Sequence, residues 1–196
     1  MRVGNATFEG ETLVLPKGET HSIYDSVLRE CVLTLDCAGR DLILGGSLLE
    51  DCKIVARRRF ARKRWSSVRL TRCTFEGTYS ENWFGCDPGP SAMNLPRGSI
   101  ERCDFSKAIL DYCIFLNTDI SRHALPGWPV FTLLNSHYPA LRTLPWPGGL
   151  ELYVGDRERM PSEVANSFYV PTLLKHHTFD PDALRELLTG VEGVIL

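Results

Sequence analysis

The sequence lacks the features that would place the protein in a membrane or outside the cell. No apolar run approaches the length of about 18 residues that a transmembrane helix requires. The amino-terminal stretch MRVGNATFEG has neither the apolar core nor the cleavage site of a secretory signal. The seven cysteines are an odd number and form no C-x-x-C pair, which argues against a disulfide framework and against a zinc site. These absences predict a cytoplasmic protein with reduced thiols.

Recognised catalytic motifs are missing as well. The chain contains no G-x-S-x-G, no Walker loop, no dinucleotide fingerprint and no H-E-x-x-H. His176, His177 and Asp180 could donate to a metal, but adjacent histidines on one loop rarely converge on a single ion. Cys86 has no histidine close in sequence that could serve as its base. We therefore expect no enzyme activity, no cofactor and no metal.

The clearest positive signal is a large apolar residue at every fifth position. Residues 103–122 read CDFSK, AILDY, CIFLN and TDISR, with an apolar residue in the middle of each five. An α-helix repeats about every 3.6 residues and a flat strand about every 2, so neither produces this period. With one insertion near Gly45-Gly46 and a second before Phe60, the period extends over most of the first 122 residues. It passes through Phe8, Leu13, Gly18, Ile23, Leu28, Leu33, Ala38, Ile43, Leu49, Ile54, Phe60, Trp65, Leu70, Phe75, Leu95, Ile100, Phe105, Leu110, Phe115 and Ile120.

A small residue usually stands two positions before the apolar one. Cys31, Cys52 and Cys73 hold this place at equal intervals, each of which corresponds to four fives and one insertion. In this pattern the sequence resembles the pentapeptide-repeat family, in which a small residue, a polar residue and a central Leu or Phe recur. The resemblance covers residues 6–75 and 93–122, and it implies a right-handed quadrilateral β-helix with four fives in each coil. We expect the three cysteines to stack as small buried residues along one wall.

The period fails after Phe75, where glycine and proline residues mark turns. We expect a loop inserted at about residues 76–94. Its aromatic residues Tyr79, Trp83 and Phe84 either fold back over the edge of a coil or form a contact surface, since Tyr and Trp are frequent in interface hot spots.

Basic residues are concentrated in one segment. From Lys53 to Arg72 the chain has nine basic residues and no acidic one, whereas the rest carries the other 13 basic and all 24 acidic residues. Such a segment attracts polyanions or an acidic protein surface. The alternative is a solvated face that the acidic remainder neutralises. The candidate contact residues in this segment are Arg57, Arg58, Arg59, Arg62, Lys63 and Arg64.

Two of these cations conflict with the repeat. Arg58 and Lys63 fall at positions that should face inward, and burial of unpaired cations is costly. We therefore expect the wall to bulge outward around Phe60 and Trp65.

Residues 123–196 follow no repeat and are predicted to cap the β-helix. An uncapped end would expose apolar core and unpaired strand edges. We expect a short strand at residues 150–154 and a helix over residues 162–169 that Ser162 caps. A terminal helix is predicted from Asp180 as N-cap to Gly190 as its stop. The predicted fold is thus mainly β: a pentapeptide-type β-helix over residues 1–122, capped by a small α/β region.

A rigid scaffold with two excursions rich in arginine and aromatic residues favours a binding function. We expect an immunity-type inhibitor, a small bacterial protein that sequesters a cognate toxin and blocks its active site. The resemblance also leaves open a protein that acts on a DNA topoisomerase or another nucleic-acid enzyme, as acidic, DNA-shaped members of the family do. A third possibility is direct binding of nucleic acid through residues 57–64. We expect a protein partner and no membrane contact.

Overall fold

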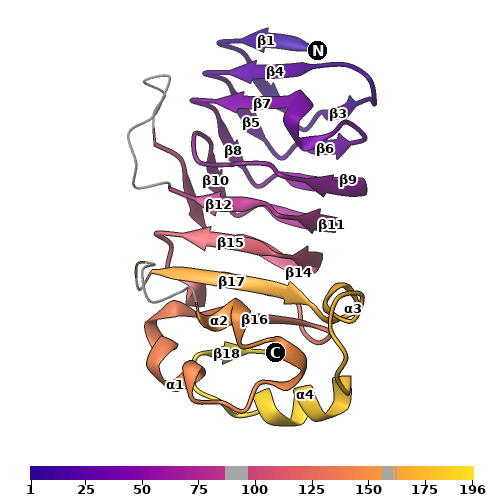
Figure 1. Cartoon of the computed structure of the whole chain (residues 1–196). Helices are drawn as coiled ribbons and strands as arrows, with labels where there is room; N and C mark the ends of the chain where they lie inside the picture. Colours follow the sequence, from indigo (N-terminus) through magenta and orange to yellow (C-terminus); the bar gives the residue numbers. More distant parts are fainter. Residues whose placement is uncertain (87–96, 156–160, 162) are drawn as a thin grey trace.

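The computed structural model describes residues 1–86, 97–155, 161 and 163–196, and it shows a β-solenoid closed at one end by a region of mixed strands and helices (Figure 1). The strands of each coil pair in parallel with those of the next coil. The prediction of a mainly β fold built from stacked coils and capped by an α/β region is confirmed. No helix in the described part of the chain has the length and apolar character needed to cross a bilayer.

Three parallel sheets form the walls of the solenoid. The first contains β1 (Arg2–Gly4), β4 (His21–Tyr24) and β7 (Leu42–Gly45). The second contains β2 (Thr7–Glu9), β5 (Val27–Arg29), β8 (Leu48–Glu50), β10 (Arg69–Thr71) and β13 (Ser99–Glu101). The third contains β3 (Thr12–Leu15), β6 (Val32–Leu35), β9 (Lys53–Ala61), β11 (Thr74–Ser80) and β14 (Asp104–Asp111).

The register of these sheets repeats with the length of one coil. Val3 lies opposite Ile23, and Ile23 in turn lies opposite Leu44 on the following coil. The step from Leu70 to its partner Ile100 is longer than either of these. Because the strands are parallel and in register, equivalent positions of successive coils stack on one another.

The predicted five-residue period describes most of the core. Leu28, Ile54 and Phe75 are fully buried, as are most other predicted slots between Ile23 and Phe115. Cys31, Cys52 and Cys73 are free and buried, which confirms their structural role, and the Cys52 thiol donates to the Leu28 carbonyl oxygen at 3.3 Å. The predicted slot Leu95 lies outside the described residues.

The first insertion lies earlier than predicted. Ile43 is only half-buried, and its neighbour Leu44 takes the inward position opposite Ile23. The extra residue is absorbed by a short 3₁₀ turn, η1 (Gly39–Asp41), instead of by Gly45-Gly46. From Leu44 to Ile54 the chain resumes its steps of five.

The corners of the coils use left-handed backbone conformations. Glu30, Asp51, Arg72 and Arg102 occupy equivalent corners with φ between 50° and 53°. Residues other than glycine are uncommon in this region, and the amides of Glu30, Asp51 and Arg72 donate to carbonyl oxygens of the next coil, which holds these corners in place.

The C-terminal region closes the stack by reversing the strand direction. β12 (Trp83–Gly85) pairs in parallel with β15 (Cys113–Leu116), and β17 (Val164–Tyr169) then pairs with β15 in antiparallel fashion. β16 (Val130–Leu134) and β18 (Val194–Ile195) complete this sheet. Around it lie η2 (Ile120–Arg122), η3 (Asn135–His137), α1 (Tyr138–Arg142), η4 (Pro147–Gly149), α2 (Leu152–Gly155), α3 (Val170–Leu173) and α4 (Pro181–Leu188).

Two local predictions for this region are wrong and one is confirmed. Residues 162–169 were expected to be helical, but Val164–Tyr169 form β17, because the open edge of β15 offers pairing that overrides local preference. Residues 150–154 were expected to form a strand, yet the chain turns into α2, and Leu150, Tyr153 and Val154 recur at helical spacing. Ser162, the predicted cap of the helix over residues 162–169, lies outside the described residues.

The terminal helix α4 is confirmed, with the Asp180 side chain accepting from the Asp182 amide.

Candidate functional site

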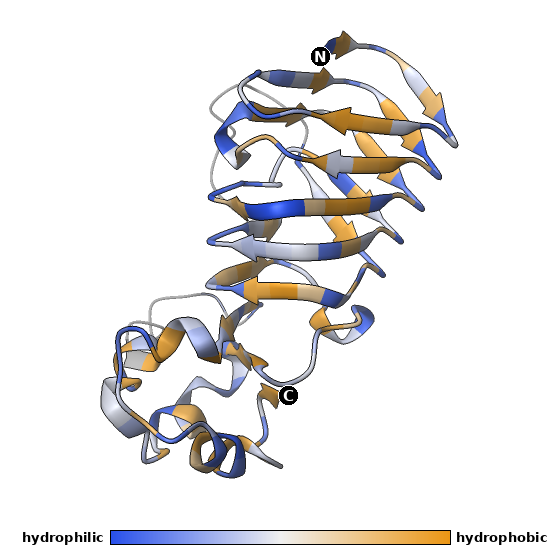
Figure 2. Cartoon of the chain, turned by 90° about the vertical axis from the view of Figure 1, so that its right-hand side faces the viewer, coloured by the Kyte–Doolittle hydropathy of each residue, from blue (hydrophilic) through white to orange (hydrophobic). Residues whose placement is uncertain are grey.

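The arginine run lies on an outward bulge of the third wall. Ala56 pairs with Gly77, and the next paired residues are Phe60 and Tyr79, so three residues of β9 stand opposite one residue of β11. Arg57, Arg58 and Arg59 are the extra stretch and are exposed, whereas Ala56 and Phe60 are buried. Figure 2 shows this hydrophilic stretch between apolar parts of β9. The predicted bulge near Phe60 is therefore confirmed.

Most of the exposed arginines here already have acidic partners. Arg57 Nη1 lies 3.7 Å from Asp36 Oδ2, and Arg62 Nε lies 2.9 Å from Glu81 Oε2. Arg59 Nη2 lies 3.5 Å from Asp111 Oδ2. Arg58 makes no ion pair with any part of the chain that the structure describes. The segment therefore forms a surface of mixed charge in which Arg58 and Arg64 make no ion pair with the described residues.

Arg64 and Trp83 extend this surface toward the neighbouring wall. An isolated parallel bridge brings the two residues together, and the Arg64 guanidinium carbon lies 4.4 Å from the centre of the Trp83 ring. Arg64 is exposed and Trp83 is partly exposed. Such a cation–π contact contributes about 0.5–1 kcal/mol at an exposed site and holds both groups in place. We call Arg57, Arg58, Arg59, Arg62, Arg64 and Trp83 the bulge surface.

Two of the predicted aromatic contact residues belong to the core instead. Tyr79 and Phe84 are fully buried, and the Tyr79 hydroxyl donates to the Ile54 carbonyl oxygen at 2.8 Å. The prediction of a loop over residues 76–94 is wrong for residues 76–86, which continue the coil through β11 and β12. The apolar period is hidden there because the step from Phe75 to Tyr79 is one residue short, after which Phe84 follows at five. Residues 87–94 lie outside the described residues.

Lys63 is also not a contact residue. Its side chain is buried, and Nζ donates to the Leu42 carbonyl oxygen at 2.7 Å. Burial lowers the pKa of Lys63 to about 8. Gly39 allows this arrangement, because a Cβ at that position would meet the Ala61 carbonyl oxygen and stand 3.3 Å from the Lys63 Cβ. The sequence pattern correctly gave Lys63 an inward position, and the expectation that the wall would bulge there to expose it is wrong.

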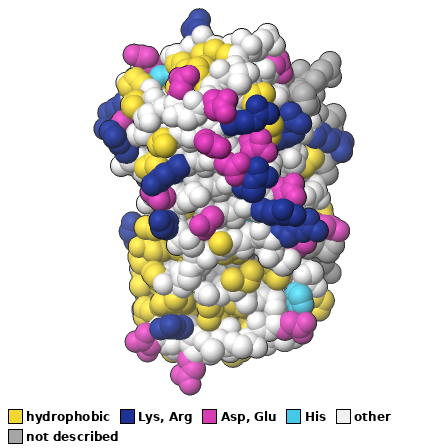
Figure 3. All heavy atoms as spheres, turned by 180° about the vertical axis from the view of Figure 1, so that it is seen from behind, with side chains coloured by type: hydrophobic (Ala, Val, Ile, Leu, Met, Phe, Trp, Pro, Cys, Tyr) yellow, Lys and Arg dark blue, Asp and Glu magenta, His cyan; other side chains and the backbone are white. Residues whose placement is uncertain are grey.

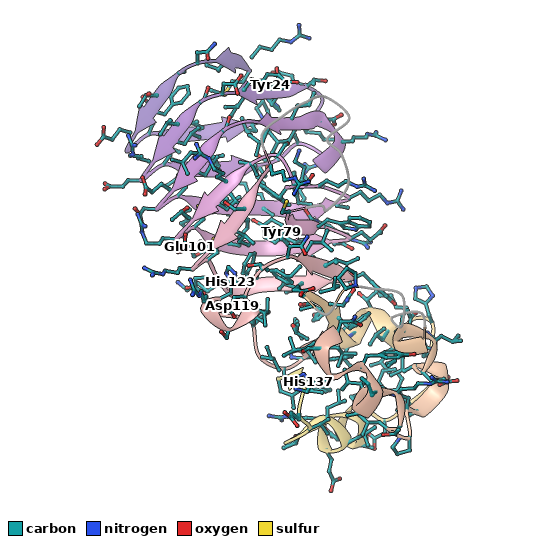
Figure 4. The ribbon with its side chains drawn as sticks, turned by 90° about the vertical axis from the view of Figure 1, so that its left-hand side faces the viewer. Tyr24, Tyr79, Glu101, Asp119, His123 and His137 are labelled. Carbon is teal, nitrogen blue, oxygen red and sulfur yellow. The ribbon has the colours of Figure 1, made fainter. Side chains whose placement is uncertain are left out.

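A second group of polar residues lies where the solenoid meets the cap. A pocket of about 230 Å³ is lined by Cys86, Glu101, Asp119 and His123, among others, and Figure 4 labels three of these residues. The sequence gave no sign of this proximity, since Cys86 and His123 are far apart along the chain.

His123 has a structural role in that pocket. Its Nδ1 accepts a hydrogen bond from the Cys103 amide at 3.1 Å, so Nε2 carries the proton and donates to Thr118 Oγ1 at 3.0 Å. Burial lowers the pKa of His123, which keeps the ring neutral. With both nitrogens engaged, the imidazole links three segments of the last coil and is not placed to act as a base for Cys86.

A larger cleft of about 620 Å³ opens beside this pocket, between η2 and β17. Asp119 lines it, but its carboxylate accepts from the Ser121 amide and hydroxyl and from Arg122 Nε. Within the described residues, no three His, Cys, Asp or Glu side chains are grouped to hold a metal ion. Among the surfaces of the described residues, the bulge surface is therefore the stronger candidate site.

Comparisons with protein-family models and with curated proteins give no match.

Proposed function

We propose that this chain is a binding protein of the pentapeptide-repeat type and that it holds a partner protein through the bulge surface. The observation that carries this proposal is the bulge itself. Two extra residues in β9 interrupt an otherwise regular wall and place Arg57, Arg58 and Arg59 in solvent beside a fully buried core. A β-bulge disrupts strand pairing locally and re-aims the side chains it carries, so we treat this one as a functional feature of the fold.

The charge pattern of the surface favours a protein over a nucleic acid. Asp36 and Glu81 lie among the arginines, within 4 Å of Arg57 and Arg62 respectively. A phosphate backbone laid across this surface would meet these carboxylates and be repelled by them. A protein partner can match the alternation with carboxylates opposite the free guanidinium and polar groups elsewhere.

Arg58 and the Arg64–Trp83 pair are the expected energetic centre of the interface. Arg57, Arg59 and Arg62 already bind internal carboxylates, so a partner's acidic group gains little by competing for them. Arg58 has no such competitor, and Trp and Arg are enriched among residues that dominate binding energy.

The activity that best fits such a surface is sequestration of a cognate toxin in the cytoplasm. A rigid coil stack presents a preformed surface, which lowers the entropy lost on binding and suits an inhibitor that must bind tightly. Mimicry of DNA for a topoisomerase has less support. The back of the solenoid carries basic and acidic side chains next to one another and is not uniformly acidic (Figure 3). On the second wall, Glu50 pairs with both Arg29 and Arg72.

The test is capture of the tagged chain's partner from nuclease-treated extract of its source organism, at low and at moderate salt. We compare the wild type with Arg58→Glu and with Arg69→Glu, a matched charge reversal at an exposed arginine of β10 on another wall. The proposal expects one stoichiometric protein, retained by the wild type and by Arg69→Glu at both salts and lost with Arg58→Glu. The captured protein is then assayed for an activity that the chain blocks at equal molar amounts.

Recovery of nucleic acid alone, released at moderate salt, would overturn the proposal. Equal loss of the partner in both charge-reversal variants would show that net charge matters and the bulge surface does not.

A further inference from the structure

Asp111 is a buried carboxylate beneath one end of the bulge surface. It is the last residue of β14 and is 3% exposed, although a carboxylate is rarely buried without compensation. Its Oδ2 accepts a hydrogen bond from the Ser80 hydroxyl at 3.1 Å. Arg59 Nη2 approaches the same oxygen at 3.5 Å and donates to Ser80 Oγ at 2.6 Å. Arg59, Ser80 and Asp111 thus form one connected group across β9, β11 and β14.

Two residues of the cap, Thr172 and Lys175, also act on the Asp111 carboxylate. Burial raises the pKa of Asp111, whereas Ser80, the Thr172 hydroxyl and the charges of Arg59 and Lys175 act in the opposite direction. Thr172 belongs to α3 and Lys175 follows it, and Figure 1 shows α3 beside the end of β14. Asp111 Oδ1 has no hydrogen-bond partner among the described residues, so the compensation falls on Oδ2 and on the nearby cations.

We propose that Asp111 is a positioning residue that fixes the Arg59 guanidinium in the bulge surface and makes its position depend on the docked cap. A buried carboxylate needs a counter-charge, and Arg59 supplies it while donating to Ser80 Oγ. The same nitrogen, Nη2, lies farther from Glu81 Oε1, at 3.9 Å. The guanidinium is thereby ordered before any partner arrives, and although its charge is already paired, it gives the bulge surface beside Arg58 a fixed shape. The consequence for affinity rests on the proposed function, but the ordering of Arg59 does not.

The ordering is tested without a partner, by the rate at which phenylglyoxal modifies individual arginines of the intact chain. Tandem mass spectrometry of chymotryptic peptides distinguishes modified Arg58 from modified Arg59, and Arg58 is the internal standard because it makes no ion pair with the described residues. In the wild type, Arg59 is expected to react at least fivefold more slowly than Arg58. In Asp111→Asn the two rates are expected to agree within twofold, and in Asp111→Glu the difference is expected to return in part.

The cap's part is tested by Thr172→Val, which should raise the Arg59 rate by about twofold and leave the Arg58 rate unchanged. Circular dichroism establishes that each variant is folded. If Asp111→Asn does not fold, Ser80→Ala removes the bridging hydroxyl and is expected to release Arg59 in the same way. An Arg59 rate that stays slow in a folded Asp111→Asn or Ser80→Ala protein would overturn the proposal.

The two proposals fail separately. If Arg59 is released in Asp111→Asn but the captured partner ignores Arg58→Glu, Asp111 positions Arg59 and the bulge surface is not the interface. If the partner is lost with Arg58→Glu but the Arg59 rate never changes, the interface stands and Asp111 has no positioning role.

Discussion

The solenoid and its cap both cover open strand edges, but they do so with strands that run in opposite directions. In the solenoid each strand leaves a free edge, and the next coil covers it with a parallel strand. In the cap, β17 covers the edge of β15 by running antiparallel to it. Parallel pairing leaves a new open strand edge on each added coil. The antiparallel strand β17 instead leads through β16 to β18, an edge strand of two residues that offers little for a further strand to pair with. Growth and termination of the stack therefore depend on strand direction more than on the kinds of residue used.

The largest expected effect comes from removing the cap. A chain that ends at Arg122 leaves the edge of β15 unpaired and uncovers the apolar side chains behind it. We expect it to aggregate, as judged by its soluble fraction and by sedimentation. Removal of residues 1–20 is the matched control. It takes away the first coil, whose β1 edge is already open, and exposes the equivalent edge of β4 on the second coil. A soluble, monomeric 1–122 chain would contradict our account of termination.

The next effect concerns the interior of the solenoid. The Phe84 ring lies 5.3 Å from that of Phe115 and 5.7 Å from that of Trp65, in stacked contacts on both sides. Phe84→Ala should lower the free energy of unfolding by about 3–5 kcal/mol, measured by urea denaturation. Its neighbour Trp83 is partly exposed, so Trp83→Ala should cost only about 1 kcal/mol. Similar losses in the two variants would show that the aromatic stack adds no special stability.

Lys63 provides a pH-dependent comparison with the exposed cations of the same segment. Its pKa falls to about 8 in the folded state, so folding favours the neutral amine. Above the ordinary lysine pKa of about 10.4, Lys63 is neutral in both states and its burial carries no penalty for charge. As the pH falls from about 10 toward 8, the unfolded state gains the proton first and the folded state becomes less stable. At pH 7 this penalty is about 3 kcal/mol.

Lys63→Met should therefore be about 1–2 kcal/mol more stable than the wild type at pH 7, after allowance for the lost hydrogen bond to Leu42. The difference should shrink between pH 8 and pH 10 in urea titrations. Arg58→Met, on the exposed bulge, is the control and should show no such trend. A pH-independent difference between Lys63→Met and the wild type would refute this explanation.

The smallest effect belongs to the cap's own terminal helix. Asp180→Ala removes the side chain that accepts from the Asp182 amide at the start of α4 and should cost about 1 kcal/mol in thermal or urea unfolding. Asp180→Asn, which can still accept that bond, should recover most of the loss. No difference between the two variants would mean that the cap bond is replaced by water.

The same contrast explains what could be predicted from sequence. In the solenoid, Leu28, Ile54 and Phe75 each face the same environment one coil apart, so a local period reports a long-range contact. Prediction failed where the step length changed, at Leu44 and again at Tyr79, because the period alone cannot show where a residue is inserted or removed. In the cap, Val164–Tyr169 form a strand because β15 and β16 pair with its two edges, which no local pattern reveals.

The candidate site was partly predictable for a related reason. Arg58 and Lys63 both conflict with an inward-facing pattern, and the conflict at Arg58 correctly indicated a bulge, whereas Lys63 is buried. Which arginines would find carboxylates depended on Asp36, Glu81 and Asp111, which lie on neighbouring coils and come near only after folding. Lys63 was misassigned because the acceptor that holds its ammonium group, the Leu42 carbonyl, is a backbone group.

The antiparallel strand β17 has a further consequence during synthesis. Each coil can dock on its predecessor soon after it leaves the ribosome, because its partner strands belong to the coil made just before it. β15 is complete at Leu116, but its covering strand is not finished until Tyr169. For the time taken to translate about 50 residues, a few seconds at ordinary rates, the nascent chain carries an open, apolar-backed strand edge. Slower translation of the residues between β15 and β17 therefore lengthens the time for which this edge is open and lowers the expected yield of folded protein.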